Sequence, residues 1–502
     1  MSDATSSPDV PERVSTGIGG LDRILAGGFM LGGIYMVRGA PGAGKTILTN
    51  QICFHHVSGG GRALFVTLLA ENHARMMSNL RSLSFFDDTR IPEKLSYLSA
   101  FRELKEKGLK GLIDLIRREI QRTRASMLVI DGLVSAQVAA EDEQTFKQFI
   151  RDLQEIALAT DCTMFLTASA IEDISPEQTM VDGLIQLNDR LYGWEAESDL
   201  QVTKFRGSGF LRGRHSYAVT SDGMVVYPRT EALLARPSRS DQTAVIRVST
   251  GIERLDAMIG AGGLPGASTT MVMGPSGVGK TTLGLQFLSR SSPSEPGLMF
   301  SFYETPERLQ AKAAGVCPNL APLLESGAVA LMWQPPVAGM LDAYGEALLT
   351  AIRQRKIKRL FIDGLTSFKN AAVDPSRIGH FFSALANELR VLGVTTLYSL
   401  EVPNILGPAV RVPVDDVSSL AENMILLRYV ELRSNVYRMI SVLKIRDGDF
   451  NPSLYQFSIS ANGLDISATT ESAEAILASL EGSPGQYAPS QTSANPRAEG
   501  GT

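Results

Sequence analysis

Two glycine-rich segments carry residue types suited to binding phosphate groups: GAPGAGKT at 39–46 and GPSGVGKT at 274–281. An apolar stretch precedes each segment and a helical pattern follows it, which is the strand, loop and helix context that this motif requires. Backbone N–H groups in such a loop close around phosphates at a helix N-terminus. The glycines predicted to shape the two loops are Gly39, Gly42, Gly44, Gly274, Gly277 and Gly279.

The last two residues of each segment predict which ligands are held. Lys45 and Lys280 are expected to reach the β- and γ-phosphates of a nucleotide, and the hydroxyls of Thr46 and Thr281 are expected to bind Mg²⁺. The chain therefore predicts two sites that bind nucleotide phosphates and Mg²⁺.

An aspartate follows each loop at a similar distance. MLVIDGL at 127–133 and LFIDGL at 360–365 are short apolar runs that end in Asp131 and Asp363. Such runs are typical of buried parallel strands, and ligands bind at the carboxyl ends of these strands. We expect both aspartates to hold the metal through water.

These landmarks repeat in the same order. RVSTGI occurs at 13–18 and again at 247–252, Lys45 and Lys280 are 235 positions apart, and Asp131 and Asp363 are 232 apart. A repeat of this length indicates two homologous domains rather than a solenoid of short repeats. The predicted fold class is α/β, with two tandem P-loop domains, each a mostly parallel twisted sheet flanked by helices.

Composition shifts suggest the boundaries. The predicted parts are a disordered tail at 1–12, a first repeat at 13–235, a linker at 236–246, a second repeat at 247–468, and a flexible tail at 469–502 with a short helix between Glu471 and Glu481. The last segment has too little apolar matter to order itself.

Composition and charge favour a cytoplasmic protein. The 502 residues carry a formal net charge of −5, which argues against a constitutive nucleic-acid binder. Three scattered cysteines predict free thiols rather than disulfides. The start of the chain is polar and no apolar run reaches roughly 18 residues, so no membrane segment is expected.

With both loops and both aspartates placed, the chain resembles the KaiC family of double-domain RecA-like ATPases, from residue 13 to about 468. TKFRG at 203–207, LKIRD at 443–447 and MILLRYVELRS at 424–434 add to the resemblance. It implies a homohexamer of stacked rings with ATP between subunits, slow ATP hydrolysis, and autophosphorylation in the second repeat. A KaiB-like or signalling protein is the implied partner.

The two repeats depart differently from the family pattern of two adjacent glutamates after the strand that follows the P-loop helix. In the first repeat Leu69 and Ala70 stand at these places and Glu71 follows one position later. A slip of one residue on a strand reverses the face of a side chain. The first repeat is thus expected to hydrolyse ATP poorly, or to use Glu71 in a shifted geometry. In the second repeat Tyr303 stands first and Glu304 is kept, as the predicted catalytic base.

Basic and hydroxyl residues complete the implied sites. Lys204 with Arg206 and Lys444 with Arg446 form two K-x-R motifs. The resemblance implies that both motifs act on the γ-phosphate bound by a neighbouring subunit. It also implies that Lys444 and Arg446 are catalytic groups, together with Lys280 and Glu304. Alternation along a strand would place both residues of each motif on one face. The alternative is a strand face with solvated charges.

The resemblance also implies phosphate acceptors. Ser418 and Ser419 lie in DDVSSLAENMILLRYVE at 415–431, where the family carries its phosphorylated residues. Without this flanking sequence, two serines would indicate only a solvated turn. The predicted function is an ATPase and serine autokinase in a timing or signalling ring. Two alternatives stay open: a RecA-like DNA or RNA motor or recombination accessory ATPase, and a nucleotide-gated scaffold with little turnover.

Overall fold

The computed structural model describes residues 12–69, 73–169, 177–192, 194–235, 246–260, 262–335, 337, 340–402, 421–432, 435–446 and 448–468. Several predictions from the sequence fall outside these ranges: the two tails with the short terminal helix, most of the linker, Glu71, and the phosphate acceptors Ser418 and Ser419. The chain divides into two compact units. The first is Met1–Pro237 with Pro336–Thr350 and Phe368–Leu385, and the second is Ser238–Pro335 with Ala351–Ser367 and Ala386–Thr502.

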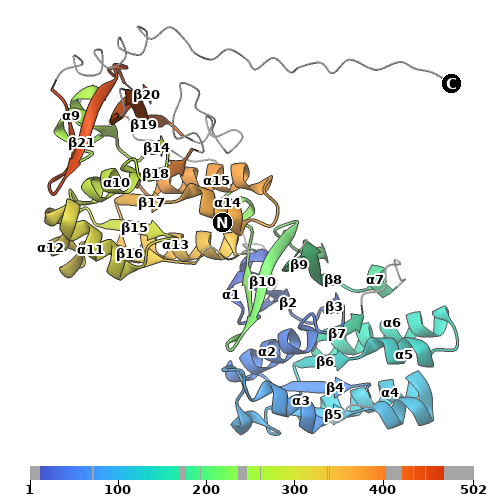
Figure 1. Cartoon of the computed structure of the whole chain (residues 1–502). Coiled ribbons are helices and arrows are strands. Elements are labelled where there is room, and N and C mark those ends of the chain that lie inside the picture. The colour runs from blue at the N-terminus through green and yellow to red at the C-terminus, as the bar shows by residue number, and fades with distance from the viewer. Residues whose placement is uncertain are drawn as a thin grey trace, which may run out of the picture. The chain divides into compact units, whose positions relative to one another are not determined.

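Strands and helices alternate through the first repeat (Figure 1). Its elements are β1 (Arg13–Val14), α1 (Gly19–Ile24), β2 (Phe29–Met30), β3 (Ile34–Gly39), α2 (Lys45–Ser58), β4 (Ala63–Thr67), α3 (His73–Leu80), β5 (Leu95–Ser99), α4 (Phe101–Thr123), β6 (Met127–Asp131), α5 (Leu133–Ala139), α6 (Glu143–Thr160), β7 (Thr163–Ser169), α7 (Glu177–Met180), β8 (Gly183–Tyr192), β9 (Glu195–Phe205), β10 (Arg214–Thr220), β11 (Gly223–Tyr227) and α8 (Thr230–Leu233).

The second repeat follows the same plan. Its elements are β12 (Arg247–Val248), α9 (Glu253–Met258), β13 (Leu264–Pro265), β14 (Thr269–Gly274), α10 (Lys280–Leu288), β15 (Gly297–Ser301), α11 (Pro306–Val316), α12 (Ala321–Glu325), β16 (Val329–Trp333), α13 (Leu341–Arg355), β17 (Arg359–Asp363), α14 (Leu365–Ala371), α15 (Arg377–Val391), β18 (Thr395–Glu401), β19 (Asn423–Leu432), β20 (Asn435–Lys444), β21 (Tyr455–Ser460) and β22 (Gly463–Ile466).

Each repeat forms one nine-stranded sheet, and the strand order is the same in both. The first sheet runs β5-β4-β6-β7-β3-β8-β9-β10-β11 and the second runs β16-β15-β17-β18-β14-β19-β20-β21-β22. The first six strands of each sheet are parallel, and the last three pair antiparallel. Two tandem RecA-like domains with mostly parallel sheets confirm the predicted fold class.

The central parallel strands are buried because helices cover both faces of the sheet, whereas the edge strands β5 and β16 are partly exposed. All five residues of β4 and of β6 are buried. Alternate residues of one strand join different cores: Phe65 packs with α2, whereas Leu64 and Val66 pack with α4 and α6. This explains why the strands around Asp131 and Asp363 have continuous apolar sequences rather than alternating ones.

The P-loop strands lie well inside the sheets. Strand β3 pairs with β7 and β8, and β14 pairs with β18 and β19. Each ends where its glycine-rich loop begins, and α2 and α10 start at Lys45 and Lys280. The predicted order of strand, loop and helix is confirmed in both repeats.

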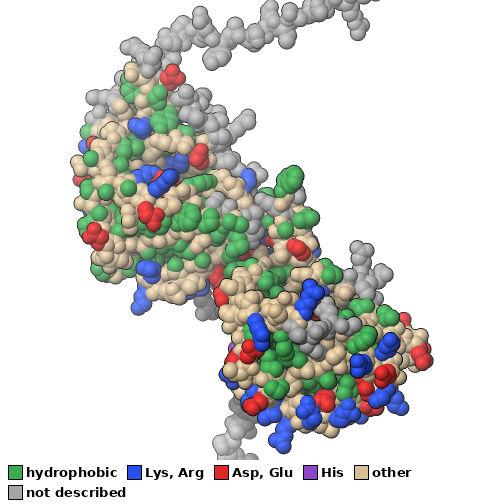
Figure 2. All heavy atoms as spheres, turned by 60° about the horizontal axis from the view of Figure 1, so that its bottom comes forward, with side chains coloured by type: hydrophobic (Ala, Val, Ile, Leu, Met, Phe, Trp, Pro, Cys, Tyr) green, Lys and Arg blue, Asp and Glu red, His purple; other side chains and the backbone are tan. Residues whose placement is uncertain are grey.

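The surface carries charges of both signs. Figure 2 shows Lys and Arg side chains interspersed with Asp and Glu on the face that it presents. The three cysteines are free and buried, as predicted. Among the described residues, no helix combines the length and apolarity that crossing a membrane requires.

Candidate functional site

The P-loop backbone of each repeat adopts a conformation that depends on glycine. Gly42 and Gly44 have φ angles of 87° and 88°, and Gly277 and Gly279 have 74° and 123°. Side chains rarely tolerate this region, so glycine is what permits the tight loop. A Cβ atom on Gly39 would lie 2.8 Å from the carbonyl oxygen of Leu187 on the adjacent strand.

The two P-loop lysines make equivalent bonds. Lys45 Nζ donates to the carbonyl oxygens of Gly39 at 2.8 Å and Ala40 at 2.9 Å. Lys280 Nζ donates to Gly274 at 2.8 Å and Pro275 at 2.7 Å. Burial lowers the pKa of both lysines, and nearby carboxylates oppose this shift. An ammonium group at the loop, with the loop's N–H groups, fits a phosphate chain.

Each P-loop threonine faces the aspartate at the end of a neighbouring strand. Thr281 Oγ1 donates to Asp363 Oδ2 at 2.9 Å, and Thr46 Oγ1 lies 3.4 Å from Asp131 Oδ2. Burial raises the pKa of Asp363, while the hydroxyls that donate to it oppose the shift. A hydroxyl beside one carboxylate suits Mg²⁺, which takes few protein ligands and completes its shell with water and substrate phosphates.

A second hydroxyl orients each aspartate. Ser399 Oγ donates to Asp363 Oδ1 at 2.6 Å and accepts the Gly364 N–H at 2.8 Å. Thr167 makes the same two contacts, with Asp131 and with the Gly132 N–H. The sequence prediction missed both residues, because β18 and β7 each carry other hydroxyl residues that give no signal of this role.

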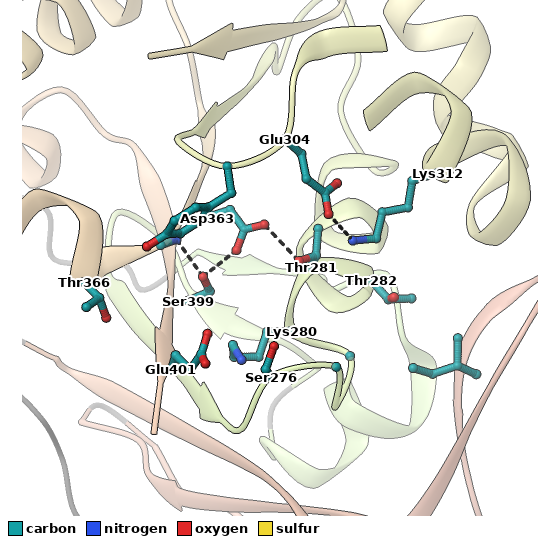
Figure 3. A pocket seen from close by; sticks show the side chains of 15 residues that line it. Ser276, Lys280, Thr281, Thr282, Glu304, Lys312, Asp363, Thr366, Ser399 and Glu401 are labelled. Carbon is teal, nitrogen blue, oxygen red and sulfur yellow. Dashed lines mark hydrogen bonds and ion pairs between the residues drawn. The ribbon is translucent and has the colours of Figure 1, made fainter. Parts of the chain in front are cut away.

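The second repeat brings these groups together around a cavity of 730 Å³ (Figure 3). This is a usual size for a small-molecule site. The cavity is lined by Ser276, Gly277, Gly279, Lys280, Thr281, Thr282, Tyr303, Glu304, Lys312, Asp363, Gly364, Thr366, Ser399, Glu401 and Ile459. The predicted P-loop residues, the predicted metal ligands and the predicted base thus share one cavity, which Glu401, from the end of β18, also lines.

Glu304 lies in the turn between β15 and α11. Its carboxylate accepts a hydrogen bond from Lys312 Nζ at 2.7 Å, and the two side chains are 31% and 35% exposed. Figure 3 shows the two groups pointing toward each other at the cavity. Tyr303, at the place of the absent first glutamate, covers Gly364, where an added Cβ would lie 3.0 Å from its ring. Leu69 covers Gly132 in the same way.

The K-x-R motifs lie at the ends of antiparallel strands, and their arginines follow the last strand residue. Lys204 Nζ donates to the carbonyls of Gln178 and Thr179, and Arg206 donates to Thr179 as well, so this pair shares one side. Lys444 Nζ donates to the Ala421 carbonyl. None of these side chains lines the described cavity.

Each arginine has a carboxylate nearby. Arg446 Nη1 lies 3.8 Å from Glu422, and Arg206 Nη1 lies 3.8 Å from Asp182. These carboxylates also accept the N–H groups of Thr269 and Ile34, where the P-loop strands begin. The sequence prediction did not pair Asp182 or Glu422 with these arginines, because an acidic residue in a loop before a strand carries no distinctive pattern.

Comparison with known proteins agrees with this geometry. A family model described as "ATPase: KaiC" matches residues 14–231 and 248–471. The chain is 24% identical to the circadian clock oscillator protein KaiC 1 of Synechocystis sp. over 497 residues, covering 94% of this chain and 92% of the relative. It is 25% identical to the circadian clock protein KaiC3 of the same organism over 488 residues, covering 93% and 94%.

A third relative is similar at the same level. The circadian clock oscillator protein KaiC of Synechococcus elongatus is 25% identical over 480 residues, covering 93% of this chain and 91% of the relative. The family model matches both repeats, and each repeat carries a P-loop, an aspartate at a strand end and the same strand order. This chain therefore belongs to the KaiC family of ATPases.

Proposed function

We propose that this chain binds ATP and Mg²⁺ at both P-loops, hydrolyses ATP mainly in the second repeat, and phosphorylates its own serines there. One observation carries the proposal: Glu304, Lys280 and the Thr281–Asp363 pair line a single cavity. A phosphate-binding loop, a metal-binding pair and a carboxylate base are the parts that phosphoryl transfer needs.

The residues of the second site divide the chemistry among them. Bound ATP supplies the phosphoryl group, and Mg²⁺ offsets the charge on its phosphates. Lys280 and the loop N–H groups bind and orient the phosphates, and Thr281 with Asp363 holds the metal. Glu304 accepts the proton of the attacking water or serine hydroxyl on a carboxylate oxygen, as a general base does.

The first repeat is proposed to serve binding more than turnover. It has the same loop and the same Thr46–Asp131 pair, but Leu69 and Ala70 stand where the second repeat has Tyr303 and Glu304. ATP held without rapid hydrolysis would stabilise a homohexameric ring with nucleotide between subunits. Lys204, Arg206, Lys444 and Arg446 are proposed to reach the nucleotide of a neighbouring subunit.

The acceptors are proposed to be Ser418 and Ser419, which lie outside the described residues. The corresponding part of the first repeat, TMVDGLIQLNDRLYGWEAE, contains Thr179 but no adjacent pair of hydroxyl residues. Each phosphate adds about −1.5 to −2 charges near Asp415 and Asp416. The resulting repulsion would couple phosphorylation to the conformation of the ring. We propose a cytoplasmic timing or signalling protein with a KaiB-like or other signalling partner. The circadian names of the relatives support the timing role.

Two other functions make different demands. A nucleic-acid motor would need a basic track, whereas the net charge is −5 and the face in Figure 2 mixes both signs. A nucleotide-gated scaffold would need no base, whereas Glu304 lines the cavity. These observations favour the ATPase and autokinase.

Phosphoprotein mass spectrometry after incubation with Mg²⁺ and ATP tests the proposal. We expect phosphate on Ser418 or Ser419 in the wild-type chain, none at Thr179, and none in Lys280→Ala. The double variant Ser418→Ala/Ser419→Ala should bind ATP but take up no label. Label that persists in the double variant would contradict the assigned acceptors, and ATP hydrolysis without any label in the wild type would favour the motor or the scaffold.

A further inference from the structure

Lys312 is a cavity residue for which the proposed chemistry has given no role. It lies on α11, two turns from the loop that carries Glu304, and its ammonium group donates to the Glu304 carboxylate at 2.7 Å. Both groups line the cavity beside Thr281 and Asp363, the proposed metal ligands (Figure 3). The ion pair therefore lies at the end of the cavity where the terminal phosphate of a nucleotide is expected.

The charges of the residues that line the cavity indicate a role for Lys312 in binding a negatively charged ligand, in addition to its ion pair with Glu304. Three carboxylates line it, from Glu304, Asp363 and Glu401, and two ammonium groups, from Lys280 and Lys312. A complex of ATP with Mg²⁺ is itself negative, so it needs the cations of the site. Lys280 donates hydrogen bonds to carbonyl oxygens of the P-loop, whereas Lys312 donates one to the Glu304 carboxylate.

A purely structural pair explains the arrangement less well. Ion pairs between side chains that are about a third exposed contribute little to stability, because water screens them. The paired strands give an alignment of the repeats, because Ser301 faces Asp363 as Thr67 faces Asp131. At the same offset the first repeat has Ala70 for Glu304 and Ser78 for Lys312. Neither a carboxylate nor a lysine stands at these two aligned positions of the repeat proposed to turn over slowly, where Glu71 follows one position after Ala70.

We propose that Lys312 is a phosphate-binding cation of the second site. When ATP binds, its ammonium group leaves the Glu304 carboxylate and contacts the terminal phosphate instead. Without nucleotide, Lys312 is hydrogen-bonded to a carboxylate oxygen of Glu304, the group that the proposed reaction needs as its base. Binding of a triphosphate then frees Glu304 to accept a proton, while a diphosphate leaves the pair intact. The site thereby distinguishes ATP from ADP. This inference rests on the proposed function of Glu304 and the cavity.

The test measures nucleotide affinity, not turnover. Full-length protein is titrated with Mg²⁺ and either AMP-PNP or ADP in competition with a fluorescent ADP analogue, and Lys280→Ala identifies the signal of the first site. All Lys312 variants are made in Glu304→Gln, which stops turnover and removes the ion pair. Lys312→Met should weaken AMP-PNP about tenfold or more, the value of a charge-assisted hydrogen bond, and ADP by less than about twofold. Lys312→Arg should restore most of the difference.

The outcomes separate the two proposals. Glu304→Gln alone should bind AMP-PNP more tightly than the wild type, because Lys312 no longer has to leave a partner. Equal losses for AMP-PNP and ADP in Lys312→Met, or no loss for either, would overturn the role of Lys312. If wild type and Lys280→Ala give the same binding signal, the second site binds no nucleotide, and this result would instead overturn the nucleotide site itself. Matching thermal unfolding of the variants shows that each is folded.

Discussion

At the scale of single residues, Glu304 is the group on which turnover should depend most. Glu304→Gln keeps the size and hydrogen bonding of the side chain but removes the base, so the rate of phosphate release should fall about 10²–10⁴-fold. The matched variant Glu71→Gln should reduce the rate much less. The opposite ranking of the two variants in a steady-state phosphate assay would reverse the roles assigned to the repeats.

His215 makes the stability of the first repeat sensitive to acid. Its Nδ1 accepts the Arg229 backbone N–H at 3.0 Å and its Nε2 donates to the Leu211 carbonyl at 3.1 Å, so the folded state holds the neutral ring. Burial lowers the pKa of His215 to about 4. The unfolded chain, with a histidine pKa of roughly 6.5, binds the proton first as pH falls.

Because the pKa of His215 is lower in the folded than in the unfolded chain, its full contribution to the free energy of unfolding is present above about pH 6.5. This contribution is lost as pH falls toward 4. The loss from this residue should reach about 3 kcal/mol at most. Denaturant unfolding of the wild type and His215→Gln at several pH values between 4 and 8 measures it. A pH dependence that is unchanged in His215→Gln would assign the acid sensitivity to other groups.

At the scale of elements, the ends of β9 and β20 should serve a neighbouring subunit. Lys444 and Arg446 do not line the cavity of the described second repeat, so we expect them to act in trans. Subunits with Arg446→Ala and subunits with Glu304→Gln should each be inactive alone and regain part of the ATPase activity when mixed. Interfaces that combine both intact groups would account for the gain, and verified mixed rings without any gain would exclude a shared site.

The elements also show what a sequence can predict. Strand, loop and helix around Lys45 and Lys280 were predictable because the motif is contiguous, and its glycines set the backbone directly. Ser399 and Thr167 were not, because a hydroxyl within a β-strand is ordinary and its role arises only when β18 or β7 pairs beside the aspartate strand. Lys312 was missed for a similar reason: only the turn between β15 and α11 brings it to Glu304.

At the scale of the whole molecule, the two P-loops should differ in what their loss does. Lys45→Ala should lower the fraction of hexamer in light scattering with ATP, since nucleotide in the first repeat is proposed to hold the ring. Lys280→Ala should affect phosphorylation far more than assembly. Normal assembly of both variants would show that the repeats do not divide the work in this way.

The equal strand order of the two sheets has a consequence for how such a chain can diverge after gene duplication. Ser301 pairs with Asp363 as Thr67 pairs with Asp131, so the strands that carry the proposed metal-binding aspartates have the same register in both sheets. Three residues that distinguish the copies, Tyr303, Glu304 and Lys312, follow β15 and lie outside the sheet. A mutation there alters chemistry without disturbing the strands that fold the domain. One repeat can therefore change its chemistry while both repeats keep the same sheet.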